Sequence, residues 1–150
     1  PSQIVRWAKG AGVALMALGL FVGMGSLTAT SYESLPKPDW IKSEEEGLRL
    51  GQQLGKPVLI DFYADWCVAC VELDRFTFSN EQVLERLEDF VAVKVDFTRN
   101  SPEKDRLVEK YGIVGLPTII FYDAEGALRP EKTLLGFISA ENFLKHIEEL

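Results

Sequence analysis

The chain has 150 residues, of which 47% are hydrophobic and 26% are charged, and its formal net charge is −7 at pH 7. This length fits one compact domain with an additional segment. The first 32 positions contain two basic residues, Arg6 and Lys9, and no acidic one. The remaining, globular part therefore has 14 basic and 23 acidic side chains, a net charge of −9. So acidic a domain argues against nucleic acid as a partner.

A long uncharged stretch occupies most of the N-terminal part of the chain. No charged residue occurs over 10–32, and these 23 residues are enough to cross a bilayer as a helix. Arg6 and Lys9 precede the stretch and Glu33 follows it. By the positive-inside rule, this arrangement places the N-terminus in the cytoplasm and the rest of the chain outside it.

A secretory signal peptide is the alternative interpretation of this segment, because basic residues, an apolar core and small residues over 26–31 also fit one. The uncharged run is longer than the ~7–15-residue core of such signals, which favours a membrane span. The chain begins with Pro1 rather than Met, which suggests a piece of a longer protein. Both interpretations place the domain outside the cytoplasm, where disulfides persist.

The predicted elements follow in a regular order. Hydrophobic periodicity, capping residues and turn residues predict helices over 43–54, 67–76, 79–87, 102–111 and 139–150, and strands over 58–63, 90–97, 118–122 and 132–135. We therefore divide the chain into a transmembrane segment over 1–32, a Pro-rich linker over 33–42 and a domain over 43–150. Two parallel strands joined through a helix, then a hairpin and a closing helix, predict a mixed sheet with helices on both faces.

The two cysteines of the chain, Cys67 and Cys70, form a Cys-x-x-Cys motif. An apolar strand leads into the motif and helix-forming sequence follows it, so we expect the dithiol at the first turn of a helix. Unpaired N–H groups and the helix dipole stabilise a thiolate there, which makes Cys67 the expected nucleophile. Cys70 lies three residues further along and deeper, and is the expected resolving thiol.

Two other interpretations of the motif are weaker. A purely structural disulfide would close a loop too short to stabilise the fold much. A structural zinc site needs four ligands, whereas the chain offers this pair and one histidine, His146, near its C-terminus. Redox chemistry is therefore favoured, and we expect no metal and no cofactor.

The residues around the motif resemble a known family. The sequence Asp-Phe-Tyr-Ala-Asp-Trp-Cys-Val-Ala-Cys at 61–70 is similar to a thioredoxin-family active site, and Gly-Leu-Pro-Thr at 115–118 resembles that family's cis-proline loop. With Thr-Phe-Ser at 77–79, the match narrows to the C-terminal periplasmic domain of the transmembrane thiol:disulfide interchange proteins of the DsbD family. The resemblance covers about 42–150 and implies an α/β thioredoxin fold, a mixed central sheet flanked by helices, here preceded by one transmembrane helix.

Two carboxylates near the dithiol are candidate catalytic groups. Asp61 stands in an apolar run, where burial raises the pKa of a carboxyl group, and the resemblance implies that it exchanges a proton with the resolving cysteine. The alternative is a structural pair with Lys94, which lies between valines in the neighbouring predicted strand. Asp74, four residues after Cys70, matches the place of an acid in DsbD-like domains, usually a glutamate; a solvated surface acid is the alternative.

Three further residues are candidates for binding the substrate polypeptide. The resemblance implies a cis peptide bond before Pro117, which would leave the backbone of Leu116 available to an extended polypeptide. An ordinary turn proline that opens a strand is the alternative. Trp66 is a candidate for an apolar docking rim, although a single aromatic residue more often serves packing.

The favoured function is that of a protein-disulfide reductase. It would accept two electrons from a membrane-embedded donor domain and reduce disulfides of extracytoplasmic proteins. We expect the chain in a bacterial inner membrane, with the thioredoxin-like domain in the periplasm. A free-standing membrane-anchored reductase for cytochrome c maturation is an alternative within the same class. A redox-inert thioredoxin-fold module that binds peptides is the alternative outside it, although such a module does not need paired thiols.

Overall fold

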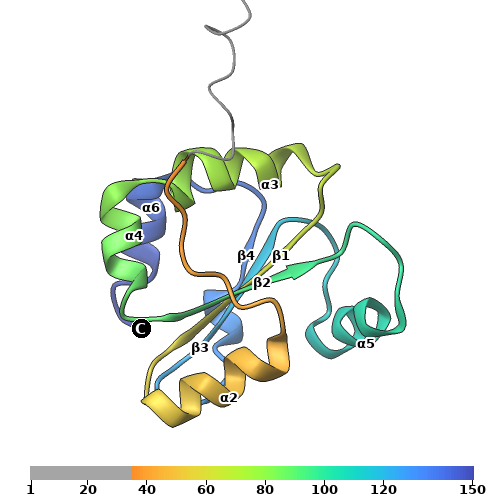
Figure 1. The fold of residues 1–150 in the computed structure, drawn as a ribbon, viewed down its shortest axis with the longest axis horizontal. Coiled ribbons are helices and arrows are strands. Elements are labelled where there is room, and N and C mark those ends of the chain that lie inside the picture. The colour runs from red at the N-terminus through yellow and green to blue at the C-terminus, as the bar shows by residue number, and fades with distance from the viewer. Residues whose placement is uncertain (1–34) are drawn as a thin grey trace, which may run out of the picture. The chain divides into compact units, whose positions relative to one another are not determined.

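The computed structural model describes residues 35–150 (Figure 1). Their elements are α2 (Glu44–Leu54), β1 (Val58–Tyr63), α3 (Val68–Leu73), the π-helix η2 (Asp74–Phe78), α4 (Glu81–Leu87), β2 (Val91–Asp96), α5 (Pro102–Tyr111), β3 (Thr118–Tyr122), the 3-10 helix η3 (Pro130–Lys132), β4 (Leu134–Leu135) and α6 (Ala140–His146). Within this part of the chain, no helix combines the length and the apolar character needed to span a bilayer. The transmembrane segment predicted over 1–32 lies outside the described residues.

Local sequence signals explain where most helices begin and end. The side chains of Ser43, Asn80, Ser101 and Ser139 accept hydrogen bonds from the first backbone N–H groups of α2, α4, α5 and α6. Such caps satisfy donors that have no partner inside the helix. Gly55 and Gly112 end α2 and α5 with φ values of 61° and 62°, in the left-handed region that glycine adopts at little cost.

Two elements near the C-terminus are shorter than the sequence predicts. The strand expected over 132–135 is reduced to β4, because residues 130–132 form η3. The helix expected over 139–150 ends at His146. Arg86 donates hydrogen bonds to the carbonyl oxygens of Ile147 and Leu150, at 3.3 and 3.1 Å, and Lys132 donates to that of His146 at 3.0 Å. These side chains satisfy carbonyl groups at the helix end and beyond it.

The sheet is mixed, as predicted. Its strand order is β2-β1-β3-β4, with β1 parallel to β2 and antiparallel to β3, and β3 antiparallel to β4. Ile41 adds a short bridge at the outer edge of β2: its N–H donates to Ala92 at 2.9 Å, and its carbonyl accepts from the N–H of Lys94 at 2.8 Å. Residues at the end of the predicted linker 33–42 thus take part in the packing of the domain.

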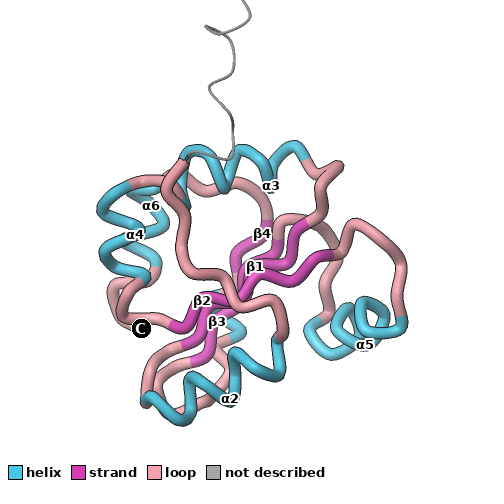
Figure 2. Tube along the Cα trace, in the orientation of Figure 1, coloured by secondary structure: helices cyan, strands magenta, loops and turns pink. Residues whose placement is uncertain are grey.

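Helices cover both faces of the sheet (Figure 2). Side chains of β1 and β2 that point to one face, such as Ile60 and Val93, pack with residues of α2 and α5. The opposite face packs against η2, α4 and α6 through an aromatic group in which Phe78 contacts Phe143 with ring centroids 5.6 Å apart. Alternation of the side chains along β1 therefore sends Asp61 to the second face, the face that η2 covers.

Gly47 and Gly51 allow α2 to lie close to the sheet. A Cβ atom on Gly47 would lie 2.1 Å from Cγ2 of Val93, and one on Gly51 would lie 2.3 Å from Cγ2 of Val58. These separations are far below van der Waals contact. The two glycines, one turn apart on the buried side of the helix, thus set the distance between α2 and the sheet.

We expect Gly47→Ala to destabilise the domain by about 1–3 kcal/mol, because Val93 is β-branched and held in a strand, so it cannot rotate away from the added methyl group. This cost exceeds the gain in helix propensity, which is about 1 kcal/mol. Urea denaturation followed by circular dichroism measures the change. The exposed Gln52→Ala, in the same helix, is the control and should stay within about 0.5 kcal/mol of wild type. Equal stability of Gly47→Ala and wild type would contradict the close contact.

Candidate active site

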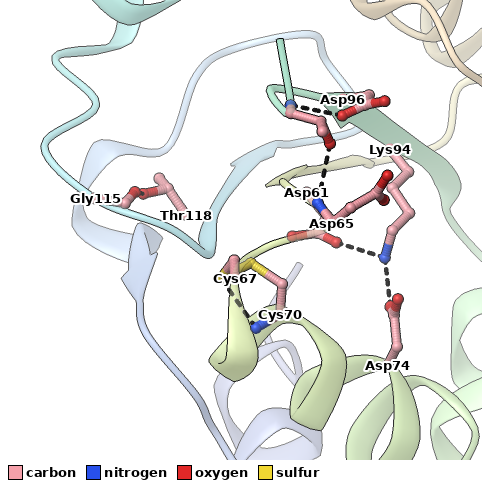
Figure 3. Close-up of a disulfide and its surroundings, with 10 residues drawn as sticks. Asp61, Asp65, Cys67, Cys70, Asp74, Lys94, Asp96, Gly115 and Thr118 are labelled. Carbon is pink, nitrogen blue, oxygen red and sulfur yellow. Dashed lines mark hydrogen bonds and ion pairs between the residues drawn. A yellow bond between two sulfur atoms is a disulfide. The ribbon is translucent and has the colours of Figure 1, made fainter.

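The two cysteines form a disulfide at the N-terminus of α3 (Figure 3). Cys67 is the residue that caps this helix, and its Sγ accepts a hydrogen bond from the N–H of Cys70 at 3.1 Å. The exposed fraction is 7% for Cys67 and 2% for Cys70. A sulfur anion at Cys67 would therefore receive a backbone N–H and the positive end of the helix dipole, while Cys70 lies deeper.

A buried row of charges lies on the side of the site where β1, β2 and η2 meet. Lys94 donates a hydrogen bond to Oδ2 of Asp61 at 3.0 Å and forms a second ion pair with Asp74 (Figure 3). Asp61 and Lys94 are almost completely buried, whereas 31% of the Asp74 side chain is exposed. The structure thus brings together both predicted acids and the lysine that the sequence offered as a structural partner.

Burial is the largest influence on the pKa of Asp61. It raises this pKa from 3.8 to about 6, although the attraction of Lys94 offsets part of the rise. Burial by itself lowers the pKa of Lys94, but the nearby carboxylates of Asp61 and Asp74 outweigh it, and the pKa ends above its ordinary value. Lys94 therefore stays charged while Asp61 titrates near neutral pH.

One oxygen of Asp61 is left without a partner. Oδ1 is buried and has no hydrogen-bond partner within residues 35–150, while Oδ2 is held by Lys94. A buried carboxylate oxygen without a donor is costly. Protonation of Oδ1 removes the charge and leaves the contact at Oδ2 in place. The arrangement is therefore suited to taking up and releasing one proton.

The loop that precedes the disulfide is fixed by the loop that follows β2. The N–H of Asp65 donates to Oγ1 of Thr98 at 2.9 Å, and the indole N–H of Trp66 donates to the carbonyl of Thr98 at 3.3 Å. The N–H of Thr98 in turn donates to Asp96 at 2.7 Å. Sequence reasoning missed Thr98. The signal was available, because residues after two adjacent parallel strands meet at the same edge of the sheet.

The peptide bond between Leu116 and Pro117 is cis. Leu116 packs against the small apolar group formed by Ala64 and the two cysteines. The carbonyl of Pro117 accepts from the N–H of Gly136 at 2.9 Å, and Oγ1 of Thr118 donates to the carbonyl of Gly115 at 2.6 Å. These contacts hold the loop beside the disulfide.

Exposed apolar side chains lie near the disulfide in the sequence or in the fold. The exposed fraction is 65% for Trp66, 73% for Val68 and 87% for Val114. Trp66 and Val68 flank Cys67, and Val114 directly precedes the cis-proline loop. Exposed apolar groups beside a reactive centre are typical of a surface that binds other proteins. In residues 35–150, no group of three or more potential ligands is placed to hold a metal ion.

Comparison with known proteins agrees with this geometry. Residues 39–124, more than half of the chain, match the family model described as thioredoxin-like. The chain belongs to the thioredoxin-like family. Its fold, predicted from the motifs at 61–70 and 115–118, is therefore confirmed.

Individual relatives narrow the assignment within the thioredoxin-like family. The thiol:disulfide interchange protein DsbD of Yersinia enterocolitica is 48% identical over 101 residues, which are 67% of this chain and 18% of that protein. DsbD of Vibrio vulnificus is 39% identical over 130 residues, 87% of this chain and 22% of that protein. The chain thus spans about a fifth of the length of these curated relatives.

A solved structure of a DsbD domain also matches this chain. The C-terminal domain of Neisseria meningitidis DsbD, in its oxidised form, is 29% identical and superimposes with a TM-score of 0.61. The match covers 73% of this chain and 97% of that one. The resemblance to DsbD C-terminal domains is therefore confirmed.

In the reduced thioredoxin-like domain, we expect Cys67 to alkylate faster than Cys70 near neutral pH, because Cys67 caps α3 and is less buried. A short pulse of iodoacetamide followed by peptide mapping measures the two rates. In urea, where the helix is absent, both cysteines should be labelled alike. Preferential labelling of Cys70 in the folded protein would reverse the assignment of nucleophile and resolving thiol.

We also expect Asp61→Asn to gain stability relative to wild type as the pH rises from 4 to 6. An acid whose pKa is higher in the folded state costs stability once it ionises; the cost begins above the unfolded pKa, 3.8, and is complete above about 6. The difference between the folded and unfolded pKa of Asp61 corresponds to a change of about 3 kcal/mol in the relative free energy of unfolding. Urea denaturation of the oxidised proteins at pH 4, 6 and 8 measures it.

The exposed Asp105→Asn is the control, and its stability should stay within about 0.5 kcal/mol of wild type. If the stability difference between Asp61→Asn and wild type is constant over this pH range, Asp61 stays ionised throughout. Asp61 would then be only a structural partner of Lys94.

Proposed function

We propose that the thioredoxin-like domain reduces disulfides of other extracytoplasmic proteins, with electrons that it receives from a membrane-embedded donor domain. The observation that carries this proposal is the disulfide at the N-terminus of α3, in a domain similar to the C-terminal domain of Neisseria meningitidis DsbD. The activity is that of a protein-disulfide reductase. Its two redox states are the dithiol and the disulfide of Cys67 and Cys70.

The reaction is two successive thiol–disulfide exchanges. The thiolate of Cys67 attacks one sulfur of the substrate disulfide, which forms a mixed disulfide and releases the other substrate sulfur as a thiolate. Cys70 then loses its proton and attacks Sγ of Cys67, which releases the second substrate sulfur. The substrate gains two electrons, and the domain is left as the Cys67–Cys70 disulfide. A donor dithiol reverses these steps and restores the reduced domain.

Asp61 serves as the proton acceptor for Cys70. Its carboxyl group titrates near neutral pH because burial raises its pKa to about 6, and its Oδ1 has no partner within the described domain. Asp74 acts through Lys94, since both acids contact the same ammonium group. In this proposal Asp61 is catalytic, and Asp74 is a positioning residue.

The substrate polypeptide binds on the apolar surface around Cys67. Trp66 offers an exposed ring whose orientation Thr98 fixes. The cis bond before Pro117 turns the chain so that Leu116 lies against the disulfide. An extended segment of the substrate pairs there with the backbone of Leu116.

The N-terminal part of the chain supports this donor and the location. The alignment with Vibrio vulnificus DsbD covers 130 residues, whereas the described part of the chain has 116, so the alignment includes some of 1–34. The uncharged run over 10–32 is long enough to span a bilayer. We therefore place the chain in the bacterial inner membrane and its thioredoxin-like domain in the periplasm, beside a membrane-embedded donor.

The proposal predicts a trapped intermediate. Cys70→Ser removes the resolving thiol, so the mixed disulfide between Cys67 and the substrate protein should accumulate. The full chain is expressed in bacterial membranes, free thiols are blocked on lysis, and adducts are detected on non-reducing gels. They should disappear on treatment with dithiothreitol.

Cys67→Ser is the matched control and should give little or no adduct. Adducts with Cys67→Ser alone would reverse the roles of the two cysteines. The absence of thiol-sensitive adducts with both variants would contradict the proposed function.

A further inference from the structure

Three aromatic rings surround the ammonium group of Lys94. Its Nζ lies 4.8 Å from the ring centroid of Tyr63, 4.9 Å from that of Trp40 and 5.6 Å from that of Phe78. Tyr63 belongs to β1 and Phe78 to η2, whereas Trp40 comes from the segment before α2. A ring face near an ammonium group attracts it, most strongly where water is excluded. The side chain of Lys94 is only 6% exposed.

The position of Trp40 is fixed by its neighbours. Its ring makes an edge contact with the buried Phe78, with centroids 5.0 Å apart. The next residue, Ile41, exchanges two backbone hydrogen bonds with β2, one of them from the N–H of Lys94 itself. Trp40 is half-buried, while Lys94 and Phe78 are buried. The segment before α2 therefore holds one side of the site in which the lysine lies.

We infer that Trp40 is a positioning residue of the redox site: its ring holds the ammonium of Lys94 between Asp61 and Asp74. The predicted linker 33–42, which contains Trp40, then connects the predicted membrane segment to the domain and also contributes a residue to the redox site. This inference deepens the proposed function, and its meaning for catalysis rests on that function.

The charges around Asp61 determine what loss of the Trp40 ring does. Lys94 on β2 and Lys42 before α2 attract its carboxylate, while Asp74 on η2 repels it; Tyr63 beside Lys94 is neutral near pH 7. Without the ring, the ammonium loses one of the contacts that hold it beside Asp61, so it moves and its attraction for this carboxylate falls. The ring lies against Lys94, so its loss weakens the attraction of Lys94 more than it changes the burial of Asp61. The pKa of Asp61 should then rise further above its ordinary value.

The test is a titration of Asp61 by carboxyl-carbon NMR in the oxidised full chain, without any partner. For Trp40→Leu we expect the midpoint to rise by about half a pH unit, a threefold change in proton affinity. The ammonium signal of Lys94 should be sharp in wild type, where the group is held, and should broaden beyond detection in Trp40→Leu. Trp40→Phe retains a ring and should restore both properties. If Trp40→Leu does not fold, Trp40→Met removes the ring with a longer and more flexible side chain that fills irregular space more readily.

Phe143→Leu is the matched control. It also removes an edge contact with Phe78, in which the two ring centroids are 5.6 Å apart. Phe143, however, is not one of the three rings around Lys94. An unchanged or lowered midpoint in Trp40→Leu would overturn the inference. The same rise in Phe143→Leu would overturn it too, because Trp40 would then act only through core packing. Since no partner takes part, the titration succeeds or fails independently of the trapping experiment for the proposed function.

Discussion

The ion pair between Asp61 and Lys94 is the interaction on which the redox site depends. The two residues face each other across the parallel strands β1 and β2, and both lie in an interior that is mostly apolar. Because successive side chains of a strand alternate between faces, a shift of one residue in this register would send one of them to the face of α2 and α5. The register that packs the core therefore also builds the charged row beside the disulfide.

The π-helix η2 completes this row. It follows α3 without a break and begins with Asp74. Its last residue, Phe78, packs in the core and makes an edge contact with the ring of Trp40. Thr77 donates a hydrogen bond to the carbonyl of Ile138, which ties η2 to the loop before α6. π-helical turns are often found at functional sites. Here one such turn gives the short side chain of Asp74 a place against Lys94.

The sequence was sufficient to predict the parts of the fold that local signals determine. Capping serines, helix-ending glycines and the apolar strands gave the order of the elements, and the Cys-x-x-Cys motif located the dithiol. Contacts between distant segments were harder to predict. The sequence suggested Lys94 as a possible partner of Asp61. That Lys94 also pairs with Asp74 depends on the π-helix η2, and no residue pattern predicted that helix. Trp40 fell in a Pro-rich linker, where an aromatic residue carries no periodic signal. Thr98 acts through its backbone as much as through its side chain.

The bridge at Ile41 also affects how the domain meets other chains. An open strand at the edge of a sheet offers unpaired N–H and C=O groups, to which a foreign strand can add and start aggregation. Ile41 occupies these groups on the outer side of β2 at Ala92 and Lys94. A protein that must receive extended polypeptides on one side gains from a blocked edge on another. The short segment before α2 thus covers part of this edge in a domain that, in the proposed function, binds extended polypeptides.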